Sequence, residues 1–275
     1  MVYTNDQRLW PVYHRRPPRM GGGDGVPVVL FHGFGNDGTT WIPLFEYFGL
    51  QREMAAPDLP GFGRHPLRQD EDPTPRWYTD RAAELLRELT IRWGQPPIVV
   101  GKSMGGMIAG LVAGELPALV RALVLIDPGG IETTEITPFW DRWRQGRNLL
   151  LPSDDSEWDE MIAVLYYQRV RIPGFLRREG LRQIRMHRER YRKIFERLLS
   201  EGYDPLGSRL SRITCPVTVI WGAHDEVMHP SGAERVRRAL PAARIEILPE
   251  CGHSPTRERP REVERILVEL FSRWG

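Results

Sequence analysis

Cysteine and lysine are scarce in this chain of 275 residues. Its two cysteines, Cys215 and Cys251, are too few for a disulfide framework, and no spacing of Cys and His is typical of a zinc site. We therefore expect neither a disulfide scaffold nor a bound metal. Only two of the 38 basic residues are lysines, Lys102 and Lys193, so arginine carries almost all of the positive charge.

Long apolar runs are also missing. No stretch reaches the roughly 18 uninterrupted apolar residues of a membrane span, and residues 1–16 (MVYTNDQRLWPVYHRR) lack the apolar core of a signal peptide. We therefore expect a cytoplasmic protein without a membrane anchor. The formal net charge of +2 gives no reason to expect nucleic acid as a partner.

Short apolar runs alternate with longer amphipathic stretches along most of the chain. We expect strands at residues 28–32, 54–58, 98–101, 123–127, 217–221 and 245–248. Helical spacing is found at residues 77–93, 105–116, 233–240 and 262–271. This alternation is typical of the α/β class, in which helices cover a parallel sheet.

Residues from about 131 to 210 interrupt the alternation. They contain no β-branched strand run, and their pattern, rich in Trp, Tyr and Arg, predicts three or four amphipathic helices. We interpret them as a helical cap (residues 131–210) inserted between the sixth and seventh strands of the sheet. Residues 1–130 and 211–275 then form the α/β core, and the chain is long enough for one such domain with an insertion.

Ser103 lies in the most informative segment, PPIVVGKSMGGMIAG. A predicted strand ends just before it, and a helix is expected to begin directly after it with no loop between. So abrupt a turn strains the serine backbone, and Gly101 and Gly105 leave the room that the turn needs. A G-x-S-x-G also arises by chance, but the strand before and the helix after are the context that this motif requires. We therefore assign Ser103 as a nucleophile.

Two backbone N–H groups are the candidate donors of an oxyanion hole. The turn at Ser103 points the N–H of Met104 toward a developing oxyanion. The strand at residues 28–32 ends in HGFGNDG, and the N–H of Phe34 in that segment is the expected second donor.

The HGFGNDG segment also permits a second interpretation. Gly33, Gly35 and Gly38 satisfy the G-x-G-x-x-G of a dinucleotide site, and Asp58 follows 20 residues after Gly38. That site requires a helix packed on the glycines, whereas NDGTTWIP, which contains Pro43, is expected to continue as a loop. We therefore expect no dinucleotide cofactor.

A serine nucleophile needs a base to take its proton and a carboxylate to hold that base. His253, in LPECGHSP directly after the last predicted strand, is the candidate base. Asp225 is the preferred acid, because it follows the strand at 217–221 and lies near the carboxyl end of the sheet. Asp127, which ends the preceding strand in LIDPG, and Glu226, adjacent to Asp225, remain alternatives for the acid.

Six segments carry a resemblance to a known family: HGFGNDGTTW, DLPGFGR, GKSMGGMIAG, LVLIDPGG, WGAHDEVMHPSGAE and LPECGHSP. Together they resemble the α/β-hydrolases across nearly the whole chain. The cap segments RNLLLPSDDSEWDEMIAVLYYQRVRIP and HRERYRKIFERLL are similar to those of the monoacylglycerol lipase (domain-6 type) branch and of related bacterial lipases. The resemblance implies a mostly parallel, eight-stranded sheet. It also implies hydrolysis of fatty-acyl or monoacylglycerol-like carboxylic esters without a metal or organic cofactor.

Serine at the nucleophile position favours acyl transfer through an acyl-enzyme, because sister enzymes that attack sp³ carbon use aspartate there. A C–C bond hydrolase of the meta-cleavage type, with the same triad and a similar cap, is the alternative. A non-catalytic receptor role is disfavoured because Ser103, Asp225 and His253 are all present. The sequence assigns no role to Lys102, and it does not indicate an oligomeric state.

The cap has two further features with more than one interpretation. Its aromatic residues either line an acyl pocket or form the core of the cap, and we expect most to be core. The arginine-rich stretch from Arg169 to Arg197 is interpreted first as a solvated face and second as a patch that contacts a membrane surface. The aromatic residues in question are Phe139, Trp140, Trp143, Tyr166, Tyr167 and Phe175.

Overall fold

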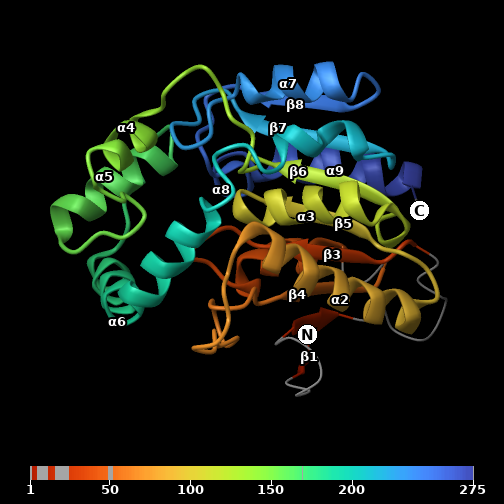
Figure 1. Cartoon of the computed structure of the whole chain (residues 1–275), viewed down its shortest axis with the longest axis horizontal. Coiled ribbons are helices and arrows are strands. Elements are labelled where there is room, and N and C mark those ends of the chain that lie inside the picture. Colours follow the sequence, from red (N-terminus) through yellow and green to blue (C-terminus); the bar gives the residue numbers. More distant parts are fainter. Residues whose placement is uncertain (1, 5–11, 16–24, 49–51, 169, 275) are drawn as a thin grey trace.

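A computed structural model describes residues 2–4, 12–15, 25–48, 52–168 and 170–274 of the chain (Figure 1). Within them, eight strands form one sheet in the order β1-β2-β4-β3-β5-β6-β7-β8. The pairs β1–β2 and β2–β4 are antiparallel, and the other neighbours are parallel. The strands are β1 (Val2–Thr4), β2 (Val12–Arg15), β3 (Val28–Phe31), β4 (Met54–Pro57), β5 (Ile98–Lys102), β6 (Ala122–Ile126), β7 (Val217–Gly222) and β8 (Arg244–Leu248).

Helices cover both faces of this sheet (Figure 1). In β5, Val99 shares a buried cluster with Ile108 of α3, whereas the next residue, Val100, shares another with Phe45 of α1 and Ile266 of α9. This period of two is expected for a strand that is buried on both faces. The helices of the core are α1 (Ile42–Phe48), α2 (Pro75–Trp93), α3 (Met104–Glu115), α7 (Gly232–Ala239), α8 (Pro255–Glu258) and α9 (Pro260–Trp274), with the short 3₁₀ helices η1 (Gly38–Trp41), η2 (Pro117–Leu119) and η3 (Gly207–Arg212).

The mostly parallel, eight-stranded fold predicted from the sequence is confirmed. The six predicted strands end within one residue of β3 to β8. The two strands that were not located, β1 and β2, have three and four residues and pair antiparallel at the edge of the sheet. Segments this short carry little periodicity, so their pairing depends on contacts distant in the sequence.

The prediction that the chain continues as a loop after Gly38 is wrong. The chain there forms η1 and continues directly into α1. Pro43 is the second residue of α1, where a missing N–H removes no helical hydrogen bond, so proline is tolerated. The helix forms because it buries one apolar face against the sheet. Its buried residues are Leu44, Phe45 and Phe48.

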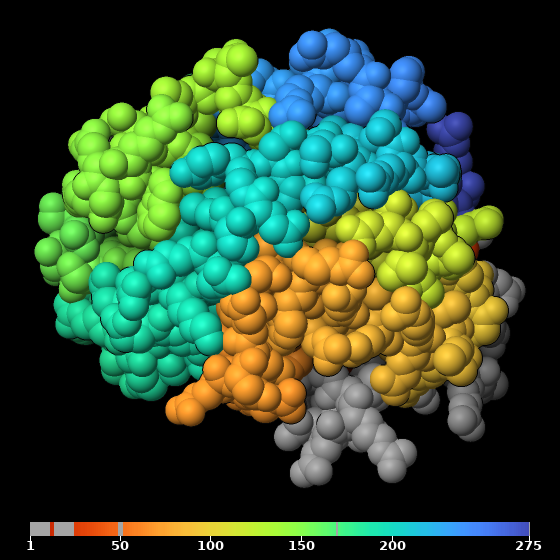
Figure 2. Space-filling view, in the orientation of Figure 1, coloured from red at the N-terminus to blue at the C-terminus, as the bar shows by residue number. Residues whose placement is uncertain are grey.

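Three α-helices separate β6 from β7: α4 (Pro138–Arg144), α5 (Asp155–Leu165) and α6 (Gly174–Leu198). They lie together at one side of the sheet, drawn in green to teal in Figure 1. Figure 2 shows α6 beside the orange segment that follows β4. There the Arg197 guanidinium donates to the Asp72 carboxylate at 2.6 Å. None of the described helices combines the length and apolar character that crossing a membrane requires.

Candidate active site

Ser103 forms a sharp turn between the end of β5 and the start of α3. Its backbone has φ 52° and ψ −120°, a conformation that costs an L-residue about 1–3 kcal/mol. A Cβ at Gly101 would overlap the backbone oxygen of Gly105, and a Cβ at Gly105 would overlap that of Phe31. The two glycines therefore have the role that the motif predicts, which is to leave room for the turn: Gly101 lets β5 approach the start of α3, and Gly105 lets α3 approach the end of β3.

The structure brings Ser103, His253 and Asp225 together in one hydrogen-bonded chain. The Nε2 of His253 lies 3.0 Å from the Ser103 Oγ, and its Nδ1 lies 2.7 Å from the Asp225 Oδ2. His253 and Asp225 are almost completely buried, with exposed fractions of 4% and 2%. In this arrangement Nδ1–H donates to the carboxylate and Nε2 is free to accept the serine proton.

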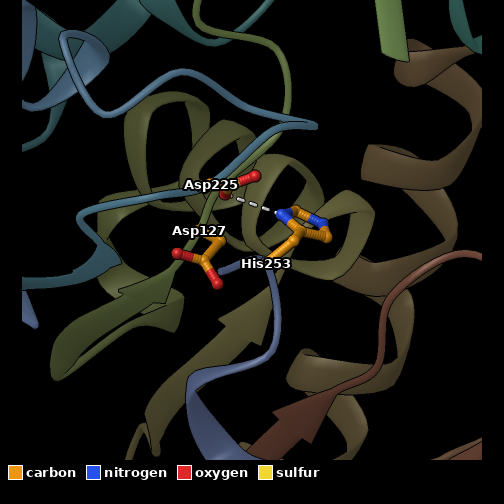
Figure 3. A group of neighbouring side chains, drawn as sticks. All are labelled: Asp127, Asp225 and His253. Carbon is orange, nitrogen blue, oxygen red and sulfur yellow. Dashed lines mark hydrogen bonds and ion pairs between the residues drawn. The ribbon is translucent and has the colours of Figure 1, made fainter. Parts of the chain in front are cut away.

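Backbone donors fix the Asp225 carboxylate on the far side of the imidazole. Its Oδ1 accepts hydrogen bonds from the N–H groups of Val227 and Met228, at 2.8 and 2.9 Å. These bonds leave Oδ2 directed at His253, as Figure 3 shows. Because both oxygens are engaged, the carboxylate has one orientation in which it can hold the base.

Asp127 lies beside this pair and does not bond to the imidazole (Figure 3). It is completely buried, and its Oδ1 accepts a hydrogen bond from the Gly222 N–H at 2.9 Å. Burial, together with the negative charge of Asp225, raises the pKa of Asp127 well above its usual value. The geometry therefore favours Asp225 over Asp127 as the acid, and among the described residues Glu226 forms no hydrogen bond or ion pair with His253.

The cluster of Asp127, Asp225 and His253 could hold a cation by distance alone, because one ligand atom of each lies within 4.8 Å of the others. The bonding of these side chains is better explained by a catalytic pair of His253 and Asp225. The Nδ1 of His253 and the Oδ2 of Asp225 already satisfy each other at 2.7 Å. A carboxyl whose pKa is raised, as that of Asp127 is, is also a poor metal ligand because it must lose its proton to bind.

The candidate oxyanion donors flank the nucleophile on two elements. Phe34 follows β3, and Met104 is the first residue of α3. The N–H of a first helical residue has no acceptor within its helix, and the Phe34 N–H donates to no protein group among the described residues. The Phe34 ring packs edge-on against Phe62, Tyr191 and Phe195, which anchors the loop.

His32, which the sequence analysis did not single out, holds the loop that carries Phe34. It is fully buried; its Nε2 accepts a hydrogen bond from the Leu59 N–H at 2.9 Å, and its Nδ1 lies 2.8 Å from the Gly33 carbonyl oxygen. Burial lowers its pKa to about 4, so the ring is neutral and donates through Nδ1–H. A histidine directly after a buried strand was the available signal, but its partners are distant in the sequence.

The glycines of the HGFGNDG segment do not form a dinucleotide site. The Asp58 carboxylate accepts hydrogen bonds from the N–H groups of Gly38 (2.8 Å) and Arg64 (2.9 Å). Asp58 is also buried, so its carboxylate fixes two loops and is not exposed to a ribose hydroxyl. A Cβ at Gly38 would also collide with the backbone oxygen of Ala56, which accounts for a glycine at that position.

Ser103 opens into a cavity of about 290 Å³ between the core and the cap. One end, toward α5 and α6, is apolar; its lining includes Trp158, Met161, Ile162, Leu165, Ile172 and Ile184. The other end carries polar side chains from the core, including Asn36, Thr40, Lys102, Ser254 and Arg257. The cavity is thus divided into an apolar end and a polar end with the nucleophile on its wall.

A second, smaller cavity of about 70 Å³ is also lined by Ser103, and its lining is largely apolar. Phe139 and Trp140 line it, and Tyr166 lines the larger cavity, so three of the six cap aromatics border the substrate space. Of the others, Trp143 packs against Phe195, Tyr167 stacks on His224, and Phe175 is exposed.

The chain belongs to the Alpha/beta hydrolase family, whose model matches residues 28–266. Among curated relatives, Monoacylglycerol lipase ABHD6 of Homo sapiens is 27% identical over 280 residues, which are 98% of this chain and 81% of that protein. Lipase 3 of Moraxella sp. (strain TA144) is 24% identical over 240 residues, 86% of this chain and 75% of that protein.

Among solved structures, a membrane phospholipase A, described as a bacterial virulence factor, is similar at a TM-score of 0.86. It is 25% identical in sequence, and the match covers 96% of this chain and 83% of that one. The family and the site geometry together show that the chain is a serine hydrolase related to lipases. Its triad is Ser103, His253 and Asp225.

Proposed function

We propose that this hydrolase cleaves carboxylic esters of fatty acids through an acyl-enzyme on Ser103. The observation that carries the proposal is the hydrogen-bonded chain from Asp225 through His253 to Ser103. It lies on the wall of two cavities with largely apolar linings, which suit an acyl chain. The names of the relatives, monoacylglycerol lipase, lipase and phospholipase A, support an acyl ester as the substrate.

In the proposed reaction, His253 Nε2 takes the hydroxyl proton of Ser103 as Oγ attacks the ester carbonyl carbon. The N–H groups of Phe34 and Met104 donate to the oxyanion that forms. The ester C–O bond then breaks, and His253 gives its proton to the departing alcohol oxygen. Water that loses its proton to His253 next attacks the acyl-enzyme, which releases the carboxylic acid and restores the serine.

The expected preference is for acyl chains longer than acetate. Each methylene group that leaves water for an apolar wall contributes about 0.8 kcal/mol, which is roughly 4-fold in kcat/KM. For 4-nitrophenyl esters from acetate to palmitate, we expect kcat/KM to rise by at least about 10-fold between acetate and hexanoate. The release of 4-nitrophenolate measures this directly.

4-Nitrophenyl phosphate is the control substrate, and it is not expected to react because it has no acyl carbonyl carbon. Failure of the folded wild-type protein to cleave any of the carboxylic esters would contradict the proposal. Turnover of a vinylogous diketone under the same conditions would then favour the C–C bond hydrolase.

We also propose that the start of α6 rests on an anionic lipid surface. Arg171 and Arg178 are exposed there, and neither pairs with a carboxylate in the described part of the chain. Ile172, in the same segment, lines the larger cavity, so lipid bound here would lie next to that cavity. Arg169 lies outside the described residues. Exposed apolar side chains accompany the arginines: Tyr167, Val170, Phe175 and Leu176.

Sedimentation with lipid vesicles tests this surface. We expect the protein to sediment with phosphatidylglycerol vesicles at low salt and far less with phosphatidylcholine vesicles. The double variant Phe175→Glu/Leu176→Glu is expected to bind at least about 10-fold more weakly, because it removes two apolar contacts and adds two negative charges. Ile91→Glu, which alters an equally apolar side chain of α2 that is 82% exposed, is the matched control and should bind normally. Equal binding by both variants would contradict the proposal.

A further inference from the structure

Lys102 is the last residue of β5 and directly precedes the nucleophile. Lys102 has an exposed fraction of 7%, and it lines the larger cavity together with Ser103 and His253. Among the described residues, no hydrogen-bond acceptor and no carboxylate within 4 Å meets its ammonium. The ammonium is not among the buried polar atoms that lack a partner, so it keeps some exposure to the cavity. Lysine is nevertheless rarely this buried unless it is paired.

Two of the three nearest carboxylates are occupied elsewhere, and the third, Asp127, has one oxygen, Oδ2, that accepts no hydrogen bond among the described residues. Asp127, Asp225 and Glu258 act on Lys102 through their charge alone, and that charge opposes the fall in its pKa that burial causes. Asp225 holds His253, and Glu258 accepts hydrogen bonds from the N–H groups of Gly252 and Tyr167. Burial thus lowers the pKa of Lys102, and the charges of Asp225 and Glu258 offset part of that fall. Its hydrogen-bond donors remain available to a molecule in the cavity.

A second cation faces the same end of the cavity. Arg257 of α8 is exposed and lines the cavity, and its Nη1 lies 3.5 Å from the Tyr166 hydroxyl. Its charge lowers the pKa of Lys102, so the two cations disfavour each other. Asn36 and Thr40 complete this polar end, which continues into a surface groove lined by Asn36, Thr40 and Arg257. An anion bound between Lys102 and Arg257 would relieve the repulsion of the two charges.

We infer that the larger cavity binds an acidic group, a carboxylate or a phosphate, on the alcohol portion of the ester, through Lys102 and Arg257. The inference rests on the proposed ester hydrolysis. The acyl chain then lies against the apolar side chains that line the two cavities. The alcohol portion then lies toward Lys102 and Arg257, where the ammonium and the guanidinium donate to the anion.

Matched butyrate esters test this binding site. The neutral substrate is 4-methylphenyl butyrate, and the two acidic substrates are 4-(butyryloxy)benzoate and 4-(butyryloxy)phenyl phosphate. Release of butyric acid is followed by titration, and the readout for each protein is kcat/KM for an acidic ester divided by that for the neutral ester. Forming this ratio within each variant cancels effects on folding and on the chemistry of the ester bond.

We expect Lys102→Met to lower this ratio about 10- to 100-fold for at least one acidic ester, because it removes a charge-assisted hydrogen bond. The ester that loses most identifies the acidic group as carboxylate or phosphate. Arg257→Gln, at an exposed helix position where folding is not at risk, is expected to lower the same ratio. Lys193→Met removes the other lysine of the chain, whose Nζ donates to the Glu71 carbonyl away from the cavity, and should leave the ratio unchanged.

An unchanged ratio in Lys102→Met and Arg257→Gln for both acidic esters would overturn the inference. An equal fall of kcat/KM for acidic and neutral esters would overturn it as well, because it would show that Lys102 only supports the fold around Ser103. Hydrolysis of 4-methylphenyl butyrate by the wild-type protein tests the proposed function separately, so the two failures are distinguishable.

Discussion

Replacing Ser103 with alanine is expected to lower kcat for 4-nitrophenyl butyrate by about 10⁴-fold or more. The variant keeps both cavities, but it loses the oxygen that forms the acyl-enzyme. In the wild-type protein the Nε2 of His253 lies 3.0 Å from the Ser103 Oγ, and without that hydroxyl it has no proton to take. Alanine at a φ of 52° is no more strained than serine, so the fold should be preserved. The release of 4-nitrophenolate and the circular dichroism spectrum together check the loss of activity and the retention of structure.

Ser208→Ala is the control for this variant. Ser208 lies in η3, and its hydroxyl donates to the Asp204 carbonyl oxygen outside the described cavities. Activity within about 2-fold of wild type is expected, as for most surface substitutions. A Ser103→Ala protein that retained a tenth of the wild-type kcat would show that another group performs the attack.

Replacing Asp225 with asparagine is expected to lower kcat by about 10³- to 10⁴-fold. The asparagine side chain keeps the shape of the carboxylate but can direct an N–H at Nδ1, which reverses the tautomer of His253. It also removes the charge that stabilises the imidazolium in the transition state. The decrease should appear in kcat more than in KM, because the carboxylate contacts the base and not the substrate.

Asp127→Asn is the matched comparison, and we expect less than about a 10-fold loss of kcat. Burial and the charge of Asp225 already favour the neutral form of Asp127. Asparagine reproduces that form, and its Oδ1 can still accept from the Gly222 N–H. The opposite pattern, with large loss in Asp127→Asn and small loss in Asp225→Asn, would assign the acid to the preceding strand.

The nucleophile turn could be predicted from sequence because its determinants are local. Gly101, Ser103 and Gly105 lie within five consecutive residues, and the contact that requires Gly101 is made with Gly105 in that turn. His253 and Asp225 could be predicted because each follows a strand with clear periodicity, so the sheet brings them to the same edge as Ser103.

The remaining features depend on contacts between distant residues. His32 receives a hydrogen bond from Leu59, and the hydrogen bonds of Asp58 tie together loops that begin at Gly38 and Arg64. The helix α1 forms despite Pro43 because the sheet buries its apolar face. The two cavities arise only where cap helices meet the core, so no pattern along one segment could have shown that Lys102 faces one of them.

An acyl group is expected to pass from the ester to the oxygen of Ser103 during each turnover. Mass spectrometry of the intact protein, quenched in acid within milliseconds of mixing with 4-nitrophenyl butyrate, detects this transfer. We expect a protein heavier by one butyryl group, with that mass located on the peptide containing Ser103 and missing from Ser103→Ala. Rapid hydrolysis by the wild-type protein with the added mass on another residue would contradict it.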